Sequence, residues 1–390
     1  MRVFFYVQHL LGIGHLKRAA VLARALREGG FNVTLVSGGA PTPGIDVDVQ
    51  LPPASAADLT FKTLLDDAGQ LVDDAWKRRR AAALLDVWRA SRADVLAVEL
   101  FPFGRRQMRF ELLPLLEDAT RLAPRPLVVC SVRDVIQSRP EREAETVALA
   151  TRYFDHVLVH GDPRLAAFDR SFGAAASLEG RLHYTGYVVA NAVSPSDGAA
   201  EVLVSAGGGA VGVRLLESAM LAREHTLLRG ATWRVLAGLN CSEADFRALQ
   251  RHVKPGIALE RSREDFAALL ANCALSISQA GYNTVAETLQ ARVRAVLVPF
   301  AAGGESEQTL RAQLLAERGA AMMLDESALT VESLAEAVNR AARAPRPPAD
   351  LVDLDGARRT AELIGEFWSA KNQPSAAPSA HGPLYRGPKR

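Results

Sequence analysis

The chain has 390 residues, more than one ordinary hydrophobic core accommodates, so two domains of similar size are expected. Apolar residues make up 48% and charged residues 23% of the chain, which is typical of folded globular proteins and excludes a largely disordered one. With 46 basic and 44 acidic residues the formal charge is +2, which argues against a nucleic-acid partner.

The first half alternates short apolar runs with helix-prone stretches. A helix is expected from Leu16, and a second helix-prone stretch lies between Thr60 and Arg92. The apolar runs, expected to be strands, are RVFFYV (2–7), FNVTLVSGG (31–39), ADVLAVEL (93–100), PLVVCSVRD (126–134) and HVLVHGD (156–162). Continuous apolar strands separated by helices predict a parallel sheet covered on both faces. Residues 1–189 are therefore expected to form a Rossmann-like domain.

A run of four basic residues, Lys77 to Arg80, lies within the second helix-prone stretch, beside apolar residues at helical spacing. The alternatives for this run are a solvated helix face and a phosphate-binding surface. The solvated face is the favoured interpretation.

The sequence predicts neither a metal site nor a membrane span. Cys130, Cys241 and Cys273 include no CxxC pair and are expected to be reduced, buried residues of a cytoplasmic protein. The N-terminal stretch MRVFFYVQHLL is interrupted by polar residues and has no cleavage site, so a first strand is expected rather than a signal peptide. No run of about eighteen apolar residues occurs, and peripheral contact with a membrane remains open.

The second half repeats the order of strand, Gly-rich turn and helix. Residues 190–200, ANAVSPSDGAA, are small and polar and contain Pro and Gly, which predicts a linker. Residues 201–345 are then expected to form a second Rossmann-like domain. A closing helix segment is expected over 346–371, and a disordered tail rich in Pro and Ser over 372–390. The predicted fold class is α/β, with two Rossmann-like domains.

The Gly-rich turn in VLVSAGGGAVG leaves a strand and opens a helix. There, Gly207, Gly208 and Gly209 would present backbone N–H groups at the positive end of the helix, which favours an anion such as a diphosphate. A tight turn without a ligand uses the same residues, so the motif alone leaves both interpretations open. It lacks the Lys-Ser/Thr pair of a Walker loop and the full spacing of a dinucleotide fingerprint, which disfavours an ATPase and a dehydrogenase.

The stretch SISQAGYNTVAETL predicts another strand, turn and helix, with Gln279 and Gly281 in the turn. Asn283 or Thr284 is expected to cap the helix. Glu287 is expected in the first helical turn, where its carboxylate can accept hydrogen bonds from both hydroxyls of a ribose. The alternative is a capping box formed by Thr284 and Glu287, and the two interpretations are compatible.

Together, SAGGGAVG, SISQAGYNTVAETL and VPFAAGGESEQTLRAQLLAERGAA resemble the nucleotide-sugar half of GT-B glycosyltransferases of family 28. The similarity is to the N-acetylglucosaminyltransferases of peptidoglycan synthesis in that family. It covers most of the second half of the chain and the first turn of the first half. It implies two domains that face each other across a cleft, the second binding a nucleotide-sugar donor and the first an acceptor.

The resemblance also implies roles for individual donor-side residues. Gly207 to Gly209 would hold the diphosphate, Gly281 would approach the nucleotide closely, and Glu287 would bind the ribose hydroxyls. Glu307 and Gln308 would contact the donor sugar. Glu307 stands where the peptidoglycan enzymes have a glutamine, which leaves the identity of the sugar open. The remaining residues of the predicted donor site are Gln279, Asn283 and Thr284.

The first turn, GIGH at residues 12–15, lies between the first strand and the first helix. The family has a Gly-rich turn ending in Gly-Gly-His at this position, and Gly12, Gly14 and His15 match its last residues. A histidine there faces the interdomain cleft and can act as a general base, because its pKa lies near working pH. The alternative is a helix-start histidine that bonds local backbone. With Arg18, the pattern GxGHxxR also resembles the GT-B-like UDP-sugar hydrolases of pseudaminic acid biosynthesis, in which water is the acceptor.

Two charged clusters follow strands of the first half. The stretch VELFPFGRRQMRFELLPLL carries a glutamate that is a second candidate base, Glu99. The other charged residues of this cluster are Arg105, Arg106, Arg109 and Glu111. Arginines on a loop can clamp an anionic acceptor bidentately, but Arg–Glu pairing on a solvated helix start is the favoured interpretation. In CSVRDVI, Arg133 and Asp134 follow the next strand. We assign Arg105 and Arg133 to the acceptor side, together with Gly12, Gly14 and Arg18.

The resemblance therefore implies a glycosyltransferase that takes a UDP-sugar, as the family usually does, and needs no metal and no cofactor besides this donor. His15 or Glu99 would deprotonate the acceptor. The leading alternatives are a nucleotide-sugar hydrolase or epimerase on the same fold, and a non-catalytic nucleotide-sugar-binding protein. The acceptor, which includes anionic and lipid-linked molecules among the options, and the stereochemical outcome are left open by the sequence.

Overall fold

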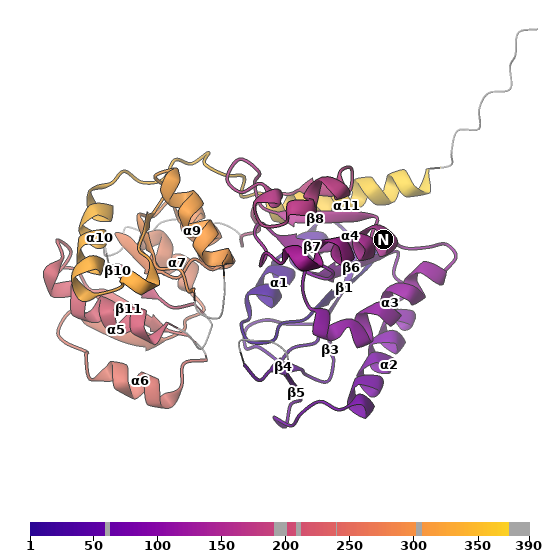
Figure 1. The fold of residues 1–390 in the computed structure, drawn as a ribbon, viewed down its shortest axis with the longest axis horizontal. Coiled ribbons are helices and arrows are strands. Elements are labelled where there is room, and N and C mark those ends of the chain that lie inside the picture. The colour runs from indigo at the N-terminus through magenta and orange to yellow at the C-terminus, as the bar shows by residue number, and fades with distance from the viewer. Residues whose placement is uncertain (59–62, 191–200, 208–211, 239, 302–305, 374–390) are drawn as a thin grey trace, which may run out of the picture.

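The computed structural model describes residues 1–58, 63–190, 201–207, 212–238, 240–301 and 306–373. In these ranges the chain forms two lobes, each built on one parallel sheet with helices on both faces (Figure 1). The predicted α/β class with two Rossmann-like halves is confirmed. Within the same ranges, no helix is both long and apolar enough to cross a membrane.

The first sheet has seven strands in the described part of the chain, in the order β3-β2-β1-β6-β7-β8-β9, all paired in parallel. The strands are β1 (Arg2–Val7), β2 (Asn32–Ser37), β3 (Val49–Gln50), β6 (Val95–Glu99), β7 (Leu127–Arg133), β8 (His156–His160) and β9 (Leu182–Tyr184). The helices are α1 (Gly14–Glu28), α2 (Asp74–Ser91), α3 (Arg109–Arg121) and α4 (Glu143–Tyr153), and a small antiparallel pair joins β4 (Ser55–Ala56) to β5 (Leu64–Leu65). The strand order reverses between β1 and β6, which is where ligands bind in such sheets.

The second sheet has six strands in the described ranges, in the order β12-β11-β10-β13-β14-β15, again all parallel. The strands are β10 (Val202–Ser205), β11 (Trp233–Ala237), β12 (Ile257–Arg261), β13 (Leu275–Ser278), β14 (Ala295–Leu297) and β15 (Met322–Met323). The helices are α5 (Val213–Ala222), α6 (Glu243–Gln250), α7 (Phe266–Asn272), α8 (Tyr282–Ala291), α9 (Glu307–Glu317) and α10 (Val331–Arg343). Here the order reverses between β10 and β13.

Both faces of the first sheet are buried because β1 alternates its side chains between two cores. Phe4 and Tyr6 point into the core formed with α2, α3 and α4. Val3, Phe5 and Val7 point into the core formed with α1 and the C-terminal helix α11 (Gly356–Asn372). A strand that is apolar at every position is the pattern expected of a parallel sheet covered on both sides.

Helix α2 corrects the interpretation of the basic run. Arg80 is fully buried, and it forms an ion pair with Glu111 of α3 and donates a hydrogen bond of 2.5 Å to Oε1 of the Gln8 side chain. Its neighbours Lys77 and Arg78 remain on the surface beside Asp74. The run is therefore a solvated face only in part.

The two lobes meet through a packed interface that lies close to both strand-order reversals. Tyr187, which follows β9, stacks on Tyr282, the first residue of α8, with a ring-centroid distance of 5.6 Å. The guanidinium of Arg18 lies 4.8 Å from the centroid of the Tyr282 ring, and Asp134 pairs with Arg311 of α9. Val135, next to Asp134, belongs to the same apolar cluster as residues of α8 and α9.

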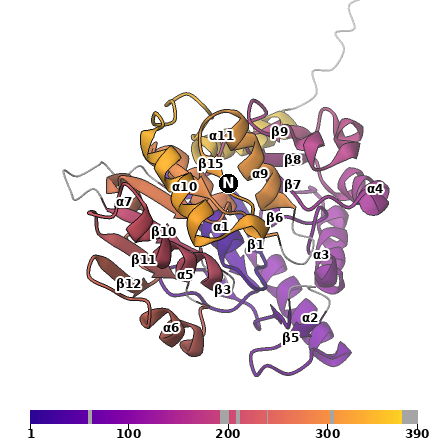
Figure 2. The ribbon, with the colours of Figure 1, turned by 60° about the vertical axis from the view of Figure 1, so that its left-hand side comes forward.

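After the second sheet, α11 returns to the first lobe and packs against α1 (Figures 1 and 2). Its Phe367 ring stacks on His156 of β8 with a centroid distance of 3.7 Å. The predicted linker, apart from residue 190, and most of the predicted tail lie outside the described residues.

Candidate functional site

The turn at Gly12–His15 places His15 at the edge of the first sheet. Strand β1 ends at Val7 and α1 begins at Gly14, so His15 is the second residue of the helix. A Cβ at Gly12 would meet nothing within 4 Å, and one at Gly14 would lie 3.5 Å from the Asn283 amide nitrogen. The turn therefore has open space on one side and the second lobe on the other.

His15 and Glu99 are brought together because β1 and β6 are neighbours and Glu99 is the last residue of β6. His15 Nδ1 lies 2.9 Å from Glu99 Oε1, and the Arg18 guanidinium, one helical turn further on, also donates to Oε1. His15 is 9% exposed and Glu99 only 1%. The two candidate bases of the sequence are thus one hydrogen-bonded pair.

The protonation states of this pair follow from its surroundings. Burial raises the pKa of Glu99, but the charge of Arg18 and the hydrogen bond from His15 outweigh it and hold that pKa far below its ordinary value. Burial, followed by the nearby charge of Arg105, lowers the pKa of His15 well below 6.5, against the opposite effect of Glu99, so the expectation that this pKa lies near working pH is wrong. Glu99 is therefore ionised and His15 neutral near pH 7.

An ionised Glu99 fixes the tautomer of His15. A carboxylate only accepts hydrogen bonds, so Nδ1 must carry the proton and donate it to Oε1. A second contact, 3.3 Å from Arg18 Nη2 to Nδ1, would require the opposite tautomer, but it is the longer of the two. Nε2 is then the bare nitrogen that can accept a proton from a ligand.

Behind Glu99 a chain of buried polar groups continues across the sheet. Glu99 and Ser131 are register partners on β6 and β7, and the Ser131 hydroxyl donates to Glu99 Oε2 at 2.5 Å. The same hydroxyl lies 2.9 Å from His160 Nε2, at the end of β8, and His160 Nδ1 lies 2.9 Å from the Thr185 hydroxyl. Sequence reasoning missed Ser131, His160 and Thr185, because only the strand order brings them together.

The predicted arginine cluster splits into separate groups. Arg105 Nε donates to the Gln8 carbonyl at 2.8 Å, and burial together with the charge of Arg133 lowers the pKa of Arg105 to about 10. Arg106 and Arg109 instead pair with Glu145 of α4. Pairing with a glutamate at a solvated surface is therefore correct for those two arginines and wrong for Arg105.

Arg133 links the two lobes. Its guanidinium forms an ion pair with Glu307, the first residue of α9, while its Nε is buried and finds no partner in the described part of the chain. Asp134, the next residue, is fully buried against Arg311, so it belongs to the interface between the lobes rather than to an acceptor surface.

The second glycine turn is described only at its two ends, because Gly208 and Gly209 lie outside the described residues. Gly207 follows β10 and has a left-handed backbone with φ +68°. Gly212, which precedes α5, has φ +114°, and a Cβ there would lie 2.5 Å from the Ala206 Cβ. Only glycine fits that second position.

The helix after β13 begins earlier than the sequence predicts. Gly281 is the residue before α8, no side chain caps the helix, and a Cβ at Gly281 would meet nothing within 4 Å. Asn283 lies inside the first turn and donates from Nδ2 to the Gly14 carbonyl at 3.0 Å. The predicted caps at Asn283 and Thr284, and the capping box with Glu287, are therefore wrong. Gln279, at the end of β13, is buried.

Glu287 is the sixth residue of α8 and so lies beyond its first turn. Its carboxylate faces Lys17 of the first lobe. Its side chain is 17% exposed, burial raises its pKa, and the Lys17 ammonium lies 4.0 Å from Oε1. A mostly buried carboxylate held by one distant cation has hydrogen-bonding capacity to spare.

Glu307 and Gln308 lie at the start of α9. Gln308 Oε1 accepts hydrogen bonds from the backbone N–H groups of Ala280 (3.0 Å) and Phe300 (3.1 Å). Gln308 thus ties the turn after β13 to the residues after β14. Glu307, 5% exposed, points toward Arg133.

Two serines that sequence reasoning missed lie at the same edge. Ser205 and Ser278 are register partners on β10 and β13, and neither buried hydroxyl has a hydrogen-bond partner in the described ranges. Unpartnered buried hydroxyls are uncommon in folded proteins. They lie where the strand order of the second sheet reverses.

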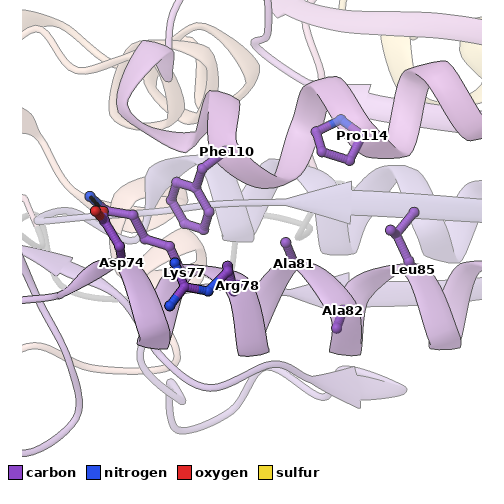
Figure 3. A pocket seen from close by; sticks show the side chains of 8 residues that line it. All are labelled: Asp74, Lys77, Arg78, Ala81, Ala82, Leu85, Phe110 and Pro114. Carbon is purple, nitrogen blue, oxygen red and sulfur yellow. Dashed lines mark hydrogen bonds and ion pairs between the residues drawn. The ribbon is translucent and has the colours of Figure 1, made fainter.

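A separate surface groove of about 490 Å³ lies between α2 and α3 (Figure 3). Phe110 and Pro114 of α3 and Leu85 of α2 line it, with Lys77 and Arg78 at one end. No predicted site residue lines this groove.

The paired Rossmann-like lobes, with polar groups gathered where each strand order reverses, define the GT-B fold of glycosyltransferases. The chain is similar over 94% of its length to the solved structure of Acinetobacter baumannii MurG, with a TM-score of 0.55 and 17% identity, covering 99% of that chain. It is similar over 95% of its length to the spinosyn rhamnosyltransferase SpnG complexed with thymidine diphosphate, with a TM-score of 0.58 and 18% identity, covering 96% of that chain.

The sequence comparison narrows the class for the second lobe. Residues 242–350 match the glycosyltransferase family 28 C-terminal domain, which confirms the predicted resemblance there. Over 105 residues the chain is 37% identical to the UDP-N-acetylglucosamine--N-acetylmuramyl-(pentapeptide) pyrophosphoryl-undecaprenol N-acetylglucosamine transferase of Thiobacillus denitrificans, covering 26% of this chain and 29% of that protein. The enzyme of the same name from Synechocystis is 31% identical over 108 residues, covering 26% and 30%. The chain thus spans less than a third of the length of these relatives.

Proposed function

We propose that the protein is a glycosyltransferase that moves a sugar from a UDP-sugar, bound by the second lobe, to an acceptor bound by the first. The observation that carries the proposal is the meeting of the two strand-order reversals. The His15–Glu99 pair lies at one, and Glu287 belongs to α8, which follows β13 at the other. The contacts Asn283 to Gly14 and Lys17 to Glu287 join them directly.

On the donor side, Glu287 accepts hydrogen bonds from the ribose hydroxyls, and the glycine turn at Gly207–Gly209 holds the diphosphate. The spare capacity of the Glu287 carboxylate and the open space beside Gly281 support this assignment. The unpartnered Ser205 and Ser278 hydroxyls supply further polar groups at the same edge.

On the acceptor side, His15 Nε2 accepts the proton of the acceptor hydroxyl while that oxygen attacks the anomeric carbon of the donor sugar. The bond from that carbon to the diphosphate breaks, and UDP leaves with the electron pair. Glu99 stabilises the imidazolium that forms, because it is ionised and hydrogen-bonded to Nδ1. Positioned general bases of this kind contribute about 10²–10⁴-fold to a rate.

The charge that develops on the leaving diphosphate requires stabilisation, which backbone N–H groups and helix N-termini at the glycine turn can supply without a metal ion. Arg105 adds positive charge on the acceptor side, which suits an anionic acceptor, whereas the charge of Arg133 is already paired with Glu307. The three cysteines are unpaired, which fits the reducing conditions of the cytoplasm.

The proposal is tested by incubating the protein with a panel of UDP-sugars, with and without hydroxyl-bearing acceptors, and measuring released UDP and glycosylated product. We expect UDP release that falls at least about 100-fold in His15→Gln, while His183→Gln, a histidine change in the same lobe away from the site, leaves it unchanged. UDP and free sugar without acceptor product would make the protein a hydrolase. No turnover of any UDP-sugar, despite UDP binding, would leave a binding protein.

A further inference from the structure

We propose that Ser131 and His160 are positioning residues for the base: through Glu99 they hold His15 in the tautomer that leaves Nε2 bare. The inference rests on the proposed function only in naming His15 as the base. It concerns a buried chain of hydrogen bonds that runs from Thr185 through His160, Ser131 and Glu99 to His15.

The direction of this chain is fixed at Glu99. Its Oε1 receives hydrogen bonds from Arg18 and His15, and in the described residues Ser131 is the one donor recorded at Oε2. An ionised carboxylate buried to this degree requires donors on both oxygens. The Ser131 hydroxyl therefore gives its single proton to Glu99, as its 2.5 Å distance indicates.

With its proton committed, the Ser131 oxygen can only accept from His160. His160 is fully buried, and burial, with the nearby charge of Arg18, lowers its pKa to about 3, so it carries one ring proton at neutral pH. That proton lies on Nε2 and points at Ser131, which leaves Nδ1 to accept from the Thr185 hydroxyl.

Thr185 has a competing acceptor, since its oxygen is also 2.9 Å from the Gly186 carbonyl. If its proton went there, His160 would carry its proton on Nδ1, and Ser131 would have to choose between the His160 nitrogen and Glu99. The charge of Glu99 decides this competition, because a hydrogen bond to an ionised acceptor is about twice as strong as one between neutral groups.

These hydrogen bonds thus fix the orientation of each side chain and do not move a charge. Each member is at most 9% exposed, so water cannot replace a missing donor easily. Without the Ser131 proton, Glu99 Oε2 has no recorded donor among the described residues, and the carboxylate is free to turn away from His15. His15 would then lose the acceptor that keeps its proton on Nδ1, and its Nε2 would carry a proton part of the time.

The test uses histidine labelled with ¹⁵N, whose ring nitrogens report the tautomer of His15 without any need for substrate. We compare wild type with Ser131→Ala, its conservative counterpart Ser131→Thr, His160→Leu and the N–H-restoring His160→Gln. The matched control is His156→Leu, on the same strand β8, whose side chain contacts His183 at 3.0 Å and takes no part in the chain.

We expect wild type, Ser131→Thr, His160→Gln and His156→Leu to show protonated Nδ1 and bare Nε2 at His15, and Ser131→Ala and His160→Leu to show a mixture. In the same variants, UDP-sugar turnover should fall about tenfold in kcat with an unchanged donor KM, the size expected for one lost hydrogen bond. Circular dichroism shows whether each variant is folded, and an unfolded Ser131→Ala or His160→Leu is replaced by Ser131→Gly or His160→Met, which also lack the hydrogen-bonding group.

An unchanged His15 tautomer in both loss variants would overturn the proposal, and so would wild type with its proton on Nε2. The tautomer result is independent of turnover. The expected tautomers in a protein that consumes no UDP-sugar would leave this inference standing and refute the proposed function.

Discussion

Arg311 of α9 holds both carboxylate oxygens of Asp134, with distances of 2.9 Å from Nε and 2.7 Å from Nη2, so one fully buried ion pair joins the two lobes. Tyr187 adds a hydrogen bond to the same carboxylate at 2.8 Å. Burial raises the pKa of Asp134, but the charge and hydrogen bonds of Arg311 lower it by more. The pKa therefore lies below its ordinary value, and the carboxylate is ionised.

Removing one partner of this pair leaves a buried, uncompensated charge. We therefore expect Asp134→Asn or Arg311→Met to reduce the free energy of unfolding by about 3–5 kcal/mol, measured by urea denaturation. The control is Arg358→Gln, which breaks exposed ion pairs on α11 and should cost less than about 1 kcal/mol. Equal effects at the two positions would show that the buried pair does not hold the lobes together.

The second prediction concerns stability in mild acid. Burial lowers the pKa of His9 and of His156 to about 4 and that of His160 to about 3, all below the unfolded value of 6.5. Between pH 6.5 and about 4 the unfolded chain binds protons that the folded chain does not, so the stability these groups contribute at neutral pH is lost as pH falls.

Each such histidine contributes up to about 1.4 kcal/mol per pH unit in this window. We expect urea denaturation from pH 7 to pH 4.5 to show falling stability, and His156→Leu to show a shallower slope by up to one proton. A His156→Leu slope equal to that of wild type would contradict the assignment for that residue.

The third prediction concerns the donor sugar. Glu307 is an acceptor only, whereas a glutamine also offers an N–H that can donate to the carbonyl of an N-acetyl group. We expect Glu307→Gln to shift the ratio of kcat/KM for UDP-N-acetylglucosamine over UDP-glucose upward by about tenfold. The control Glu326→Gln changes a carboxylate that bonds the Ala301 backbone instead. An unchanged ratio in Glu307→Gln would remove Glu307 from the sugar site.

Much of this fold can be predicted from the sequence because its strands are apolar along their whole length. The runs at 2–7, 93–100, 126–134 and 156–162 all become strands of the first sheet. Short edge strands such as β9 and β15 cannot be predicted in this way, since two or three residues give no readable periodicity. The start of α8 was misplaced because Gly281 precedes the helix without a side-chain cap, while the cap-forming residues that follow it lie inside.

The burial of Arg80 could have been predicted from its spacing to other residues of α2. Arg80, Leu84 and Trp88 are the buried residues of α2 and stand four apart, so the arginine occupies the apolar stripe of the helix. Because Arg80 also belongs to a run of four basic residues, that run alone suggests a solvated position instead. No pattern in the sequence could have revealed Ser131 and His160 as neighbours of Glu99, because their meeting depends on strand order rather than on separation along the chain.

We propose that the second lobe binds a uridine diphosphate sugar through Glu287, whose carboxylate accepts hydrogen bonds from the ribose hydroxyls. The most direct test of this proposal is calorimetric titration with UDP and with 2′-deoxyuridine diphosphate, for wild type and for Glu287→Gln. Hydrogen bonds to a charged group are worth about 1.5–3 kcal/mol, so we predict that wild type binds UDP at least about tenfold more tightly and that Glu287→Gln loses most of this difference. Equal affinity of wild type for the two nucleotides, or no binding of UDP, would contradict the account.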